Sequence, residues 1–273
     1  MTASDSKDQS NCVASERASE PRERSAPARR RARARVGESE RHSPSVDKVM
    51  GQLARAIDGL DRPAVEKISE TQKENAFQVL IGTLLSARTQ DATTLAASTR
   101  LFKAAATPRA MAALTVRQIE RLIYPVSFYR HKARHVKATC RLLLERFGGK
   151  VPSTMEDLLV LPGVGRKTAN LVLILGFNSE RNICVDTHVH RISNRLGWVR
   201  TSTPEETEQA LYRVATERWW PYINLYLVTW GQNVCRPVYP RCSRCAIAEW
   251  CPRVGVSRTA KVPDSHPDAR VAV

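Results

Sequence analysis

Residues 161–167 read Leu-Pro-Gly-Val-Gly-Arg-Lys and join two segments of helical period, Thr154 to Val160 and Arg166 to Gly176. Pro162 ends the first helix, and the two glycines permit a tight turn with positive φ. The N–H groups of such a turn lie beside the positive end of the next helix, where they can hold a phosphate without reading a base. A plain connecting turn is the alternative. The phosphate contacts that we expect here come from Gly163, Val164, Gly165 and Arg166.

The chain from Val46 onward is patterned as helices. Phe77 to Leu85 is apolar on nearly all faces, as expected of a central helix. Further helices are expected at Val136 to Phe147, Glu205 to Arg218 and Tyr222 to Gly231. No sustained alternation of period two indicates a strand, and no internal repeat of roughly 20–50 residues is present. These patterns predict an all-α protein.

The charge of the chain indicates a polyanionic partner. Its 273 residues include 43 Lys and Arg against 27 Asp and Glu, for a net charge of +16. Residues 1–46 account for only +3 of this, so the remaining 227 residues carry +13. A folded body this basic points most simply to nucleic acid. A charge that serves only solubility is the alternative.

Residues 1–46 are expected to be a disordered basic tail, since they are rich in Ser, Ala, Arg, Pro and Glu. The Arg cluster at Pro27 to Arg35 either adds non-specific DNA affinity or has no dedicated role. The tail contains no apolar segment typical of a secretory signal. The longest strongly apolar run, Leu171 to Phe177, is far shorter than the ~20 residues that span a bilayer. We therefore expect neither secretion nor membrane insertion.

Four cysteines follow one another closely near the C-terminus, in the pattern Cys235-x6-Cys242-x2-Cys245-x5-Cys251. Four thiolates on such short loops can enclose one metal centre, either a structural zinc or an iron–sulfur cluster. The 6-2-5 spacing is lopsided, whereas zinc sites usually pair two short knuckles. Three further cysteines lie outside this loop. We expect Cys12 to lie in the tail and Cys140 and Cys184 to be buried apolar residues.

Two single residues have a plain structural interpretation. Asp186 precedes Thr-x-x-x-Arg and could stabilise a helix N-terminus. Lys167 follows the Gly-rich turn and could bind a phosphate.

Several segments together carry a resemblance to a known family. They are the nonapeptide Leu161-Pro-Gly-Val-Gly-Arg-Lys-Thr-Ala169, the cysteine spacing, and the strings at 85–91 (Leu-Ser-Ala-Arg-Thr-Gln-Asp), 123–129 (Ile-Tyr-Pro-Val-Ser-Phe-Tyr) and 185–191 (Val-Asp-Thr-His-Val-His-Arg). On these segments the chain resembles endonuclease III, a family of the helix-hairpin-helix superfamily. The resemblance runs from about Val46 to Gly255.

The resemblance implies two α-helical domains with a DNA cleft between them. A six-helix barrel that contains the hairpin would run from about 69 to 179. An iron–sulfur cluster domain would combine 47–68 with 180–258, leaving 259–273 as a C-terminal tail. The implied function is a base excision repair DNA glycosylase with AP lyase activity, which removes oxidised pyrimidines and nicks 3′ to the abasic site.

The same resemblance implies roles for single residues. Lys167 would be the nucleophile and Asp186 the essential aspartate. The cofactor would be a [4Fe–4S] cluster on the four cysteines. Arg88 and Phe128 would fill the gap left by a flipped nucleotide, although the family commonly has Gln where this chain has Arg88. Further candidate phosphate contacts, each of which could equally be solvated surface, are Arg191, Arg236, Arg241 and Arg244.

The implied partner is damaged double-stranded DNA. The protein is expected to bind it as a monomer and not to associate with a membrane. The expected location is the bacterial cytoplasm, with the nucleoid, or the nucleus if the source is eukaryotic. Two alternatives stay open: a pyrimidine-dimer glycosylase/lyase of the same superfamily, and a non-catalytic helix-hairpin-helix DNA-binding protein with a structural zinc. Lys167 argues against the mispaired-adenine glycosylases, which usually lack a lysine there.

Overall fold

The computed structural model describes residues 44–71 and 75–260. Within these residues the backbone forms helices and no strand, which confirms the predicted all-α class. Most of the predicted tails, 1–46 and 259–273, lie outside the described residues, as does Cys12. In chain order the helices are α1 (Val46–Ala56), α2 (Ala64–Thr71), α3 (Ala76–Ser86), α4 (Asp91–Ala104), α5 (Pro108–Ala113), α6 (Val116–Ile123), α7 (Tyr129–Phe147), α8 (Met155–Leu159), α9 (Arg166–Phe177), α10 (Thr187–Arg195), α11 (Pro204–Val214), the 3-10 turn η1 (Glu217–Trp219), α12 (Trp220–Asn233) and the 3-10 turn η2 (Cys242–Arg244).

The helix ends follow local capping chemistry. α7 begins seven residues before Val136, the predicted start. The prediction missed its first two turns because they are rich in Arg, His and Lys and show no clear apolar periodicity. α7 ends where predicted, at Gly148, which adopts the left-handed conformation of a C-cap. α11 ends at Val214, four residues before the predicted end, and is started by Pro204 behind the Thr203 cap.

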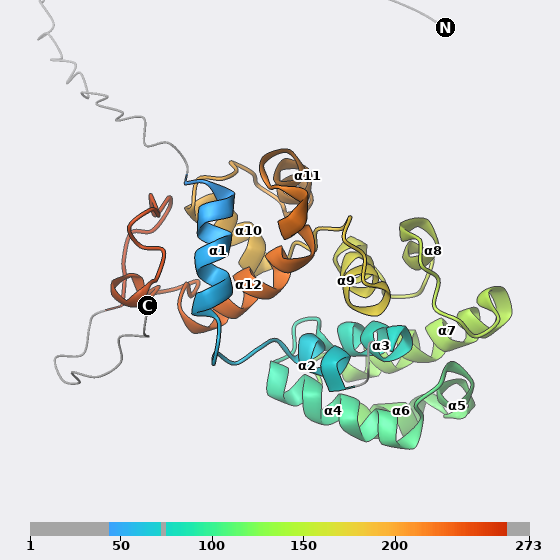
Figure 1. The fold of residues 1–273 in the computed structure, drawn as a ribbon. Coiled ribbons are helices and arrows are strands. Elements are labelled where there is room, and N and C mark those ends of the chain that lie inside the picture. Colours follow the sequence, from blue (N-terminus) through green and yellow to red (C-terminus); the bar gives the residue numbers. More distant parts are fainter. Residues whose placement is uncertain (1–43, 72–74, 261–273) are drawn as a thin grey trace, which may run out of the picture. The chain divides into compact units, whose positions relative to one another are not determined.

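One hydrophobic core lies among α2 to α9, with α3 at its centre (Figure 1). All nine residues from Phe77 to Leu85 are buried, which explains why this segment is apolar on every side. α9 packs closely on α3: a Cβ atom at Gly176 would lie 2.9 Å from Cα of Ala76. The second helix of the predicted hairpin is therefore held rigidly against the centre of the core.

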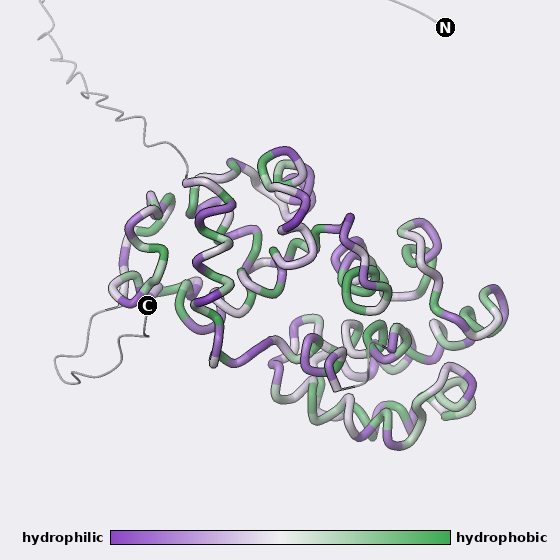
Figure 2. The backbone as a smooth tube through the Cα atoms, viewed as in Figure 1, coloured by the Kyte–Doolittle hydropathy of each residue, from purple (hydrophilic) through white to green (hydrophobic). Residues whose placement is uncertain are grey.

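A second hydrophobic core joins α1 to α10, α11 and α12, although α1 lies more than a hundred residues earlier in the chain. The Asp47 carboxylate on α1 accepts hydrogen bonds from Thr216 Oγ1 (2.8 Å), Arg218 Nη2 (2.6 Å) and Trp219 Nε1 (2.7 Å). These hydrogen bonds, first of all that from Thr216, lower the pKa of Asp47. Figure 2 shows hydrophilic and hydrophobic residues alternating along α1, as expected of a helix with one buried face.

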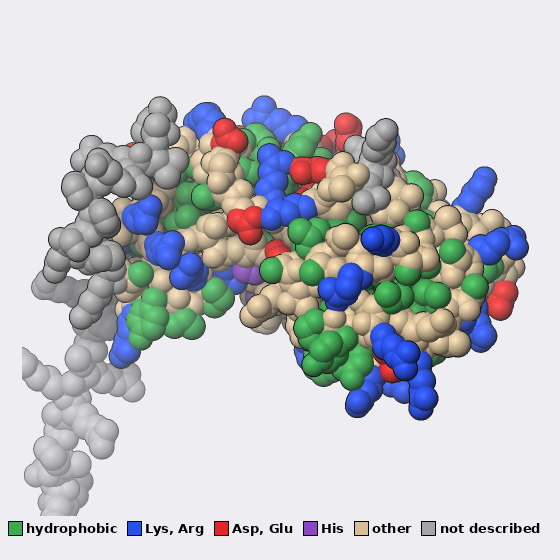
Figure 3. Space-filling view, turned by 90° about the horizontal axis from the view of Figure 1, so that it is seen from below, with side chains coloured by type: hydrophobic (Ala, Val, Ile, Leu, Met, Phe, Trp, Pro, Cys, Tyr) green, Lys and Arg blue, Asp and Glu red, His purple; other side chains and the backbone are tan. Residues whose placement is uncertain are grey.

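The first core includes Val65 and Ile68 of α2 and also Cys184, and the predicted domain boundaries stay a prediction. Lys and Arg side chains are spread over the face drawn in Figure 3. None of the helices in the described part of the chain is both long and apolar enough to cross a membrane.

Candidate active site

The turn between α8 and α9 is built around Gly163, whose φ of 81° lies in the left-handed region. A Cβ atom at this residue would lie 3.1 Å from Cγ of His135 on α7 and closer still to Nδ1. Both the backbone conformation and the packing therefore require glycine. Gly165, the N-cap of α9, has a φ of −102° and a ψ of −179°, and a Cβ there would meet nothing within 4 Å. Only Gly163 of the two glycines uses positive φ, because an N-cap needs extended backbone.

The N–H groups of this turn are not equally available to a ligand. The Val164 N–H donates to the Leu161 carbonyl oxygen (3.0 Å), so the turn itself uses it. Val164 is also buried. The N–H groups of Gly163 and Gly165 donate to no other residue in the described part of the chain. The capacity to bind an anion therefore lies at Gly165 and the positive end of α9 rather than at Val164.

Lys167 and Asp186 are brought together from two helices. Lys167 lies in the first turn of α9, and its Nζ is 3.8 Å from Asp186 Oδ2. Asp186 is the N-cap of α10, where its Oδ1 accepts hydrogen bonds from the N–H groups of His188 (2.8 Å) and Val189 (2.9 Å). The aspartate is therefore both a helix cap and the partner of the lysine. Its side chain is 11% exposed and that of Lys167 is 46% exposed, so the amine remains open to a substrate.

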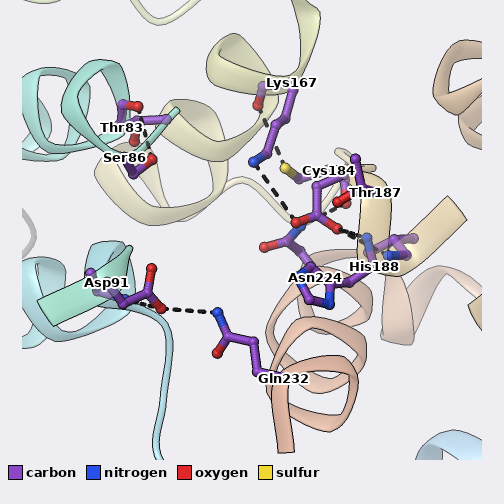
Figure 4. A network of polar contacts seen from close by, with 12 residues as sticks. Thr83, Ser86, Asp91, Lys167, Cys184, Thr187, His188, Asn224 and Gln232 are labelled. Carbon is purple, nitrogen blue, oxygen red and sulfur yellow. Dashed lines mark hydrogen bonds and ion pairs between the residues drawn. The ribbon is translucent and has the colours of Figure 1, made fainter. Parts of the chain in front are cut away.

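A pocket surrounds this pair and is lined by residues of both cores. Asp91, at the start of α4, accepts hydrogen bonds from the Ala64 N–H (3.2 Å) and from Gln232 Nε2 on α12 (3.0 Å). Asn224, also on α12, donates to the Cys184 carbonyl oxygen (3.1 Å). These bonds tie α2, α4 and α12 together around the pocket (Figure 4). The sequence prediction did not include Asp91, although the Leu-Ser-Ala-Arg-Thr-Gln-Asp string ends on it.

Arg88 and Phe128 lie on two loops at the rim of a neighbouring pocket, which Gly163, His131 and His135 also line. Both residues have left-handed backbone, with φ of 54° and 56°. Phe128 is 62% exposed, which is unusual for a large apolar side chain. The loops of Arg88 and Phe128 thus present a cationic and an aromatic side chain toward the same space.

Lys132 anchors the loop that carries Arg88. Its buried Nζ donates to the carbonyl oxygens of Leu85 (2.7 Å) and Ala87 (2.6 Å) and to Thr89 Oγ1 (2.9 Å). Burial lowers its pKa to about 8. The sequence prediction missed this residue. The only sequence signal for the burial of Lys132 is its position four residues before the buried Val136, on the apolar side of α7.

Two of the predicted phosphate contacts are used inside the fold. The Arg166 guanidinium forms two hydrogen bonds of 2.9 Å with the buried Glu208 carboxylate, and these hydrogen bonds raise its pKa. The Arg191 guanidinium donates to the Cys235 carbonyl oxygen (2.8 Å), which joins α10 to the cysteine loop. Arg236 and Arg244 are exposed, and Arg241 is half-buried. Their DNA contacts stay a prediction.

The four cysteines of the C-terminal loop line one pocket beside α10 and α12. All four are free thiols. Burial raises the pKa of Cys245 to about 11 and also raises the pKa of Cys251, with the charges of neighbouring cysteines adding to both. A bound cation would reverse this effect, since thiolates are the ligands that metals take. The donor type and the shared pocket therefore fit a four-cysteine metal group, although no three His, Cys, Asp or Glu side chains among the described residues are gathered closely enough to hold a metal ion.

The two remaining cysteines of the described chain, Cys140 and Cys184, are fully buried, as predicted. Each lies in the hydrophobic core among α2 to α9, away from the cysteine loop. They are therefore available for packing rather than for metal binding.

Comparison with known proteins identifies a matching family and similar proteins. Residues 81–217 match the HhH-GPD superfamily of base excision DNA repair proteins. The chain is 46% identical over 196 residues to endonuclease III of Thermotoga maritima, covering 71% of this chain and 92% of that protein. It is 48% identical over 188 residues to the chloroplastic endonuclease III homolog 2 of Arabidopsis thaliana, but spans only 49% of that longer protein and 66% of its own length.

Among solved structures, a trapped covalent intermediate of endonuclease III with DNA superposes with a TM-score of 0.62 at 34% identity. The match covers 66% of this chain and 84% of that one. The two-domain helix-hairpin-helix architecture predicted from the sequence is the fold of these neighbours.

Proposed function

This chain belongs to the HhH-GPD superfamily of base excision DNA repair proteins, and from that premise we propose that it excises oxidised pyrimidines from duplex DNA and then cleaves the strand 3′ to the abasic site. It is a base excision repair DNA glycosylase. One observation carries the proposed lyase step: a lysine amine in the first turn of α9 lies 3.8 Å from a capped aspartate, within one pocket.

Lys167 is the nucleophile of the proposed reaction. Its Nζ forms a bond to C1′ of the damaged nucleotide as the N-glycosidic bond breaks, and the base leaves with the bonding electrons. Asp186 accepts the proton that the amine loses and stabilises positive charge that develops on the sugar. The C1′–O4′ bond of the sugar ring then breaks and O4′ takes up a proton, which leaves an imine between Nζ and C1′ that acidifies C2′. Loss of a C2′ proton then breaks the C3′–O bond, which cuts the strand.

The damaged nucleotide must leave the base stack before Lys167 can reach C1′. We assign the filling of the resulting gap to Arg88 and Phe128, because both line the same pocket beside the hairpin. Phe128 stacks on a neighbouring base, and Arg88 hydrogen-bonds the base left without a partner. The phosphate backbone is held at the Gly165 N–H and the N-terminus of α9. The exposed arginines of the cysteine loop add charge contacts.

We propose two domains with DNA in the cleft between them, and they correspond to the two hydrophobic cores except at Val65, Ile68 and Cys184, which pack in the first core. The barrel domain runs over 69–179, and the cluster domain combines 47–68 with 180–258. Lys167 belongs to the first of these domains and Asp186 to the second. Binding of DNA across the cleft therefore places the lesion against both residues at once.

The cysteine loop is proposed to hold a [4Fe–4S] cluster on Cys235, Cys242, Cys245 and Cys251. The loop lies beside α10 and α12, and Lys167 is not among the residues that line its pocket. We therefore give the cluster a structural role, in which it orders the loop that carries Arg236, Arg241 and Arg244. Anaerobically purified protein should contain about four irons per chain and absorb broadly in the visible range. One zinc per chain without iron would contradict this.

Borohydride trapping on a duplex that contains an abasic site tests the proposed reaction. Wild-type protein should form a covalent product, and Lys167→Ala should lose it while it retains DNA binding, because the hairpin turn is unchanged. The exposed Lys150→Ala is the matched control and should trap like wild type. Undiminished trapping by Lys167→Ala would falsify the assignment of the nucleophile.

A panel of duplexes with defined lesions tests the substrate class. Excision of oxidised pyrimidines with no action on pyrimidine dimers supports the proposal, and the reverse preference contradicts it. We propose that the protein acts as a monomer in the compartment that holds the genome, namely the nucleoid-containing cytoplasm of a bacterium or a nucleus.

A further inference from the structure

The wall of the pocket around Lys167 contains two carboxyl groups that the proposed reaction does not use, those of Asp91 and Glu66. Glu66 lies in the first turn of α2 and lines this pocket together with Lys167 and Asp186. The residue is only 8% exposed. Its carboxyl group makes no hydrogen bond or ion pair with any other residue in the described part of the chain. A buried carboxyl group without a partner is costly unless a ligand completes it.

Three other polar groups of the pocket already have partners. Asp91 is held by the Ala64 N–H and by Gln232, and Asp186 caps α10 and faces Lys167. Asn224 Nδ2 is engaged with a carbonyl oxygen. Glu66 differs from these three groups, because both of its oxygens remain available to a bound molecule.

Burial favours the neutral form of this carboxyl group. It raises the pKa of Glu66 to about 7, with the charge of Glu70 adding to the rise and that of Arg62 opposing it. Glu70 and Arg62 pair with each other on the surface of α2 (2.5 Å). Ionisable groups of the other elements that line the pocket are Arg88, Asp91, Lys167, Asp186 and His188.

We infer, resting on the proposed function, that Glu66 is the residue that reads the hydrogen-bonding edge of the flipped pyrimidine, as a neutral carboxylic acid. A neutral acid presents one O–H donor beside one C=O acceptor. Thymine-derived lesions that keep the imide present an N3–H donor beside a carbonyl acceptor. Cytosine-derived lesions present an N4–H donor beside the N3 acceptor. The acid pairs with either edge through two hydrogen bonds, because either oxygen can carry the proton.

An ionised carboxylate lacks the donor and would face the carbonyl oxygen or N3 of the base with a negative charge. Recognition is therefore expected below the pKa of Glu66 and lost as the pH rises through it. The inference accounts for a substrate class that includes derivatives of both pyrimidines, since one protonated group fits both edges.

Single-turnover base release separates this role from a structural one. The substrates are one duplex with a thymine-derived imide lesion, one with a cytosine-derived lesion, and one with a preformed abasic site, each measured from pH 6 to 9. Glu66→Leu should lower base release roughly 10- to 100-fold on both lesions, the scale of two lost hydrogen bonds. Cleavage of the abasic duplex should fall far less, because that substrate has no base to read.

Glu66→Gln keeps a neutral donor beside an acceptor and should retain base release on both lesions within about 5-fold, a loss smaller than that of one hydrogen bond to a charged group. It should also lack the alkaline decline that wild type shows. The matched control is Glu145→Gln on α7, whose exposed side chain lies outside the pocket and does not affect the pKa of Glu66, and whose rates should equal those of wild type.

Three results would overturn the inference: base release and abasic cleavage falling equally in Glu66→Leu, an unchanged rate of base release in that variant, or an alkaline decline that persists in Glu66→Gln. Wild-type cleavage of the abasic duplex tests the proposed function separately. Its absence would refute the lyase step through Lys167, whatever the Glu66 variants do with intact lesions.

Discussion

The two glycines of the hairpin turn should respond to alanine in opposite ways. Gly163 has a φ of 81°, and its missing side chain makes room for the His135 ring. Gly165 has ordinary extended backbone and open space where a Cβ would be. Gly163→Ala should therefore destabilise the fold, whereas Gly165→Ala should leave the fold intact and obstruct the surface that we assign to a phosphate.

The magnitude for Gly163→Ala follows from three terms. A non-glycine residue in the left-handed region costs about 1–3 kcal/mol. Displacing His135 to admit the Cβ adds about 1–3 kcal/mol, the usual range for overpacking. Unfolded alanine has less conformational entropy than unfolded glycine, which stabilises the folded variant by about 0.4–1 kcal/mol. The middle of each range gives a net loss of about 3 kcal/mol, which lowers Tm by roughly 6–12 °C in a fold of this size.

Gly165→Ala has no strain term. The preference for Gly over Ala at an N-cap is offset by the lower entropy of the unfolded alanine, so the free energy of unfolding should change by less than about 1 kcal/mol. The added methyl group instead stands beside the N–H groups at the start of α9. Losing one phosphate contact there should reduce affinity roughly tenfold or more, with little change in the salt slope of log K, because the lost N–H donor carries no net charge.

Thermal unfolding followed by circular dichroism measures the first effect. Fluorescence anisotropy with a duplex that contains an abasic-site analogue, titrated at several salt concentrations, measures the second. A melting temperature of Gly163→Ala within about 1 °C of wild type would refute the strain argument. Unchanged affinity in Gly165→Ala would mean that the turn only connects two helices.

Two further predictions concern positions around the pocket. Asp186→Asn should slow base release roughly 100-fold or more, because the charge beside Lys167 is lost. Its free energy of unfolding should stay within about 1 kcal/mol of the wild-type value, because Asn caps a helix as well as Asp. A rate within twofold of wild type would mean that the aspartate is only a cap. Lys132→Met should lower the free energy of unfolding by about 2–4 kcal/mol, because the carbonyl groups of Leu85 and Ala87 lose their donor, and denaturant unfolding that matches wild type would contradict the anchoring role.

Much of this protein can be derived from its sequence, because the signals concerned are local. Helical period, a proline and glycine turn, and helix caps depend on residues within a few positions of one another. They predicted the all-α class and the hairpin. The spacing of the four cysteines is local in the same way, so the spacing alone indicates a metal group. Lys167 and Asp186 each stand in a recognisable string, and the structure shows that the two strings meet.

What the sequence left undecided depends on which distant segments meet. No local sequence signal indicates that α1 packs into the hydrophobic core of α10 to α12. Nor does any local signal indicate that the Arg166 guanidinium forms hydrogen bonds with the Glu208 carboxylate. Glu66 and Lys132 look like ordinary surface residues of amphipathic helices. Their burial, and with it their altered pKa and their position beside a pocket, arises only when α2 and α7 pack against the rest of the chain. Solvation and electrostatics are properties of the packed molecule, so only the tertiary structure decided them.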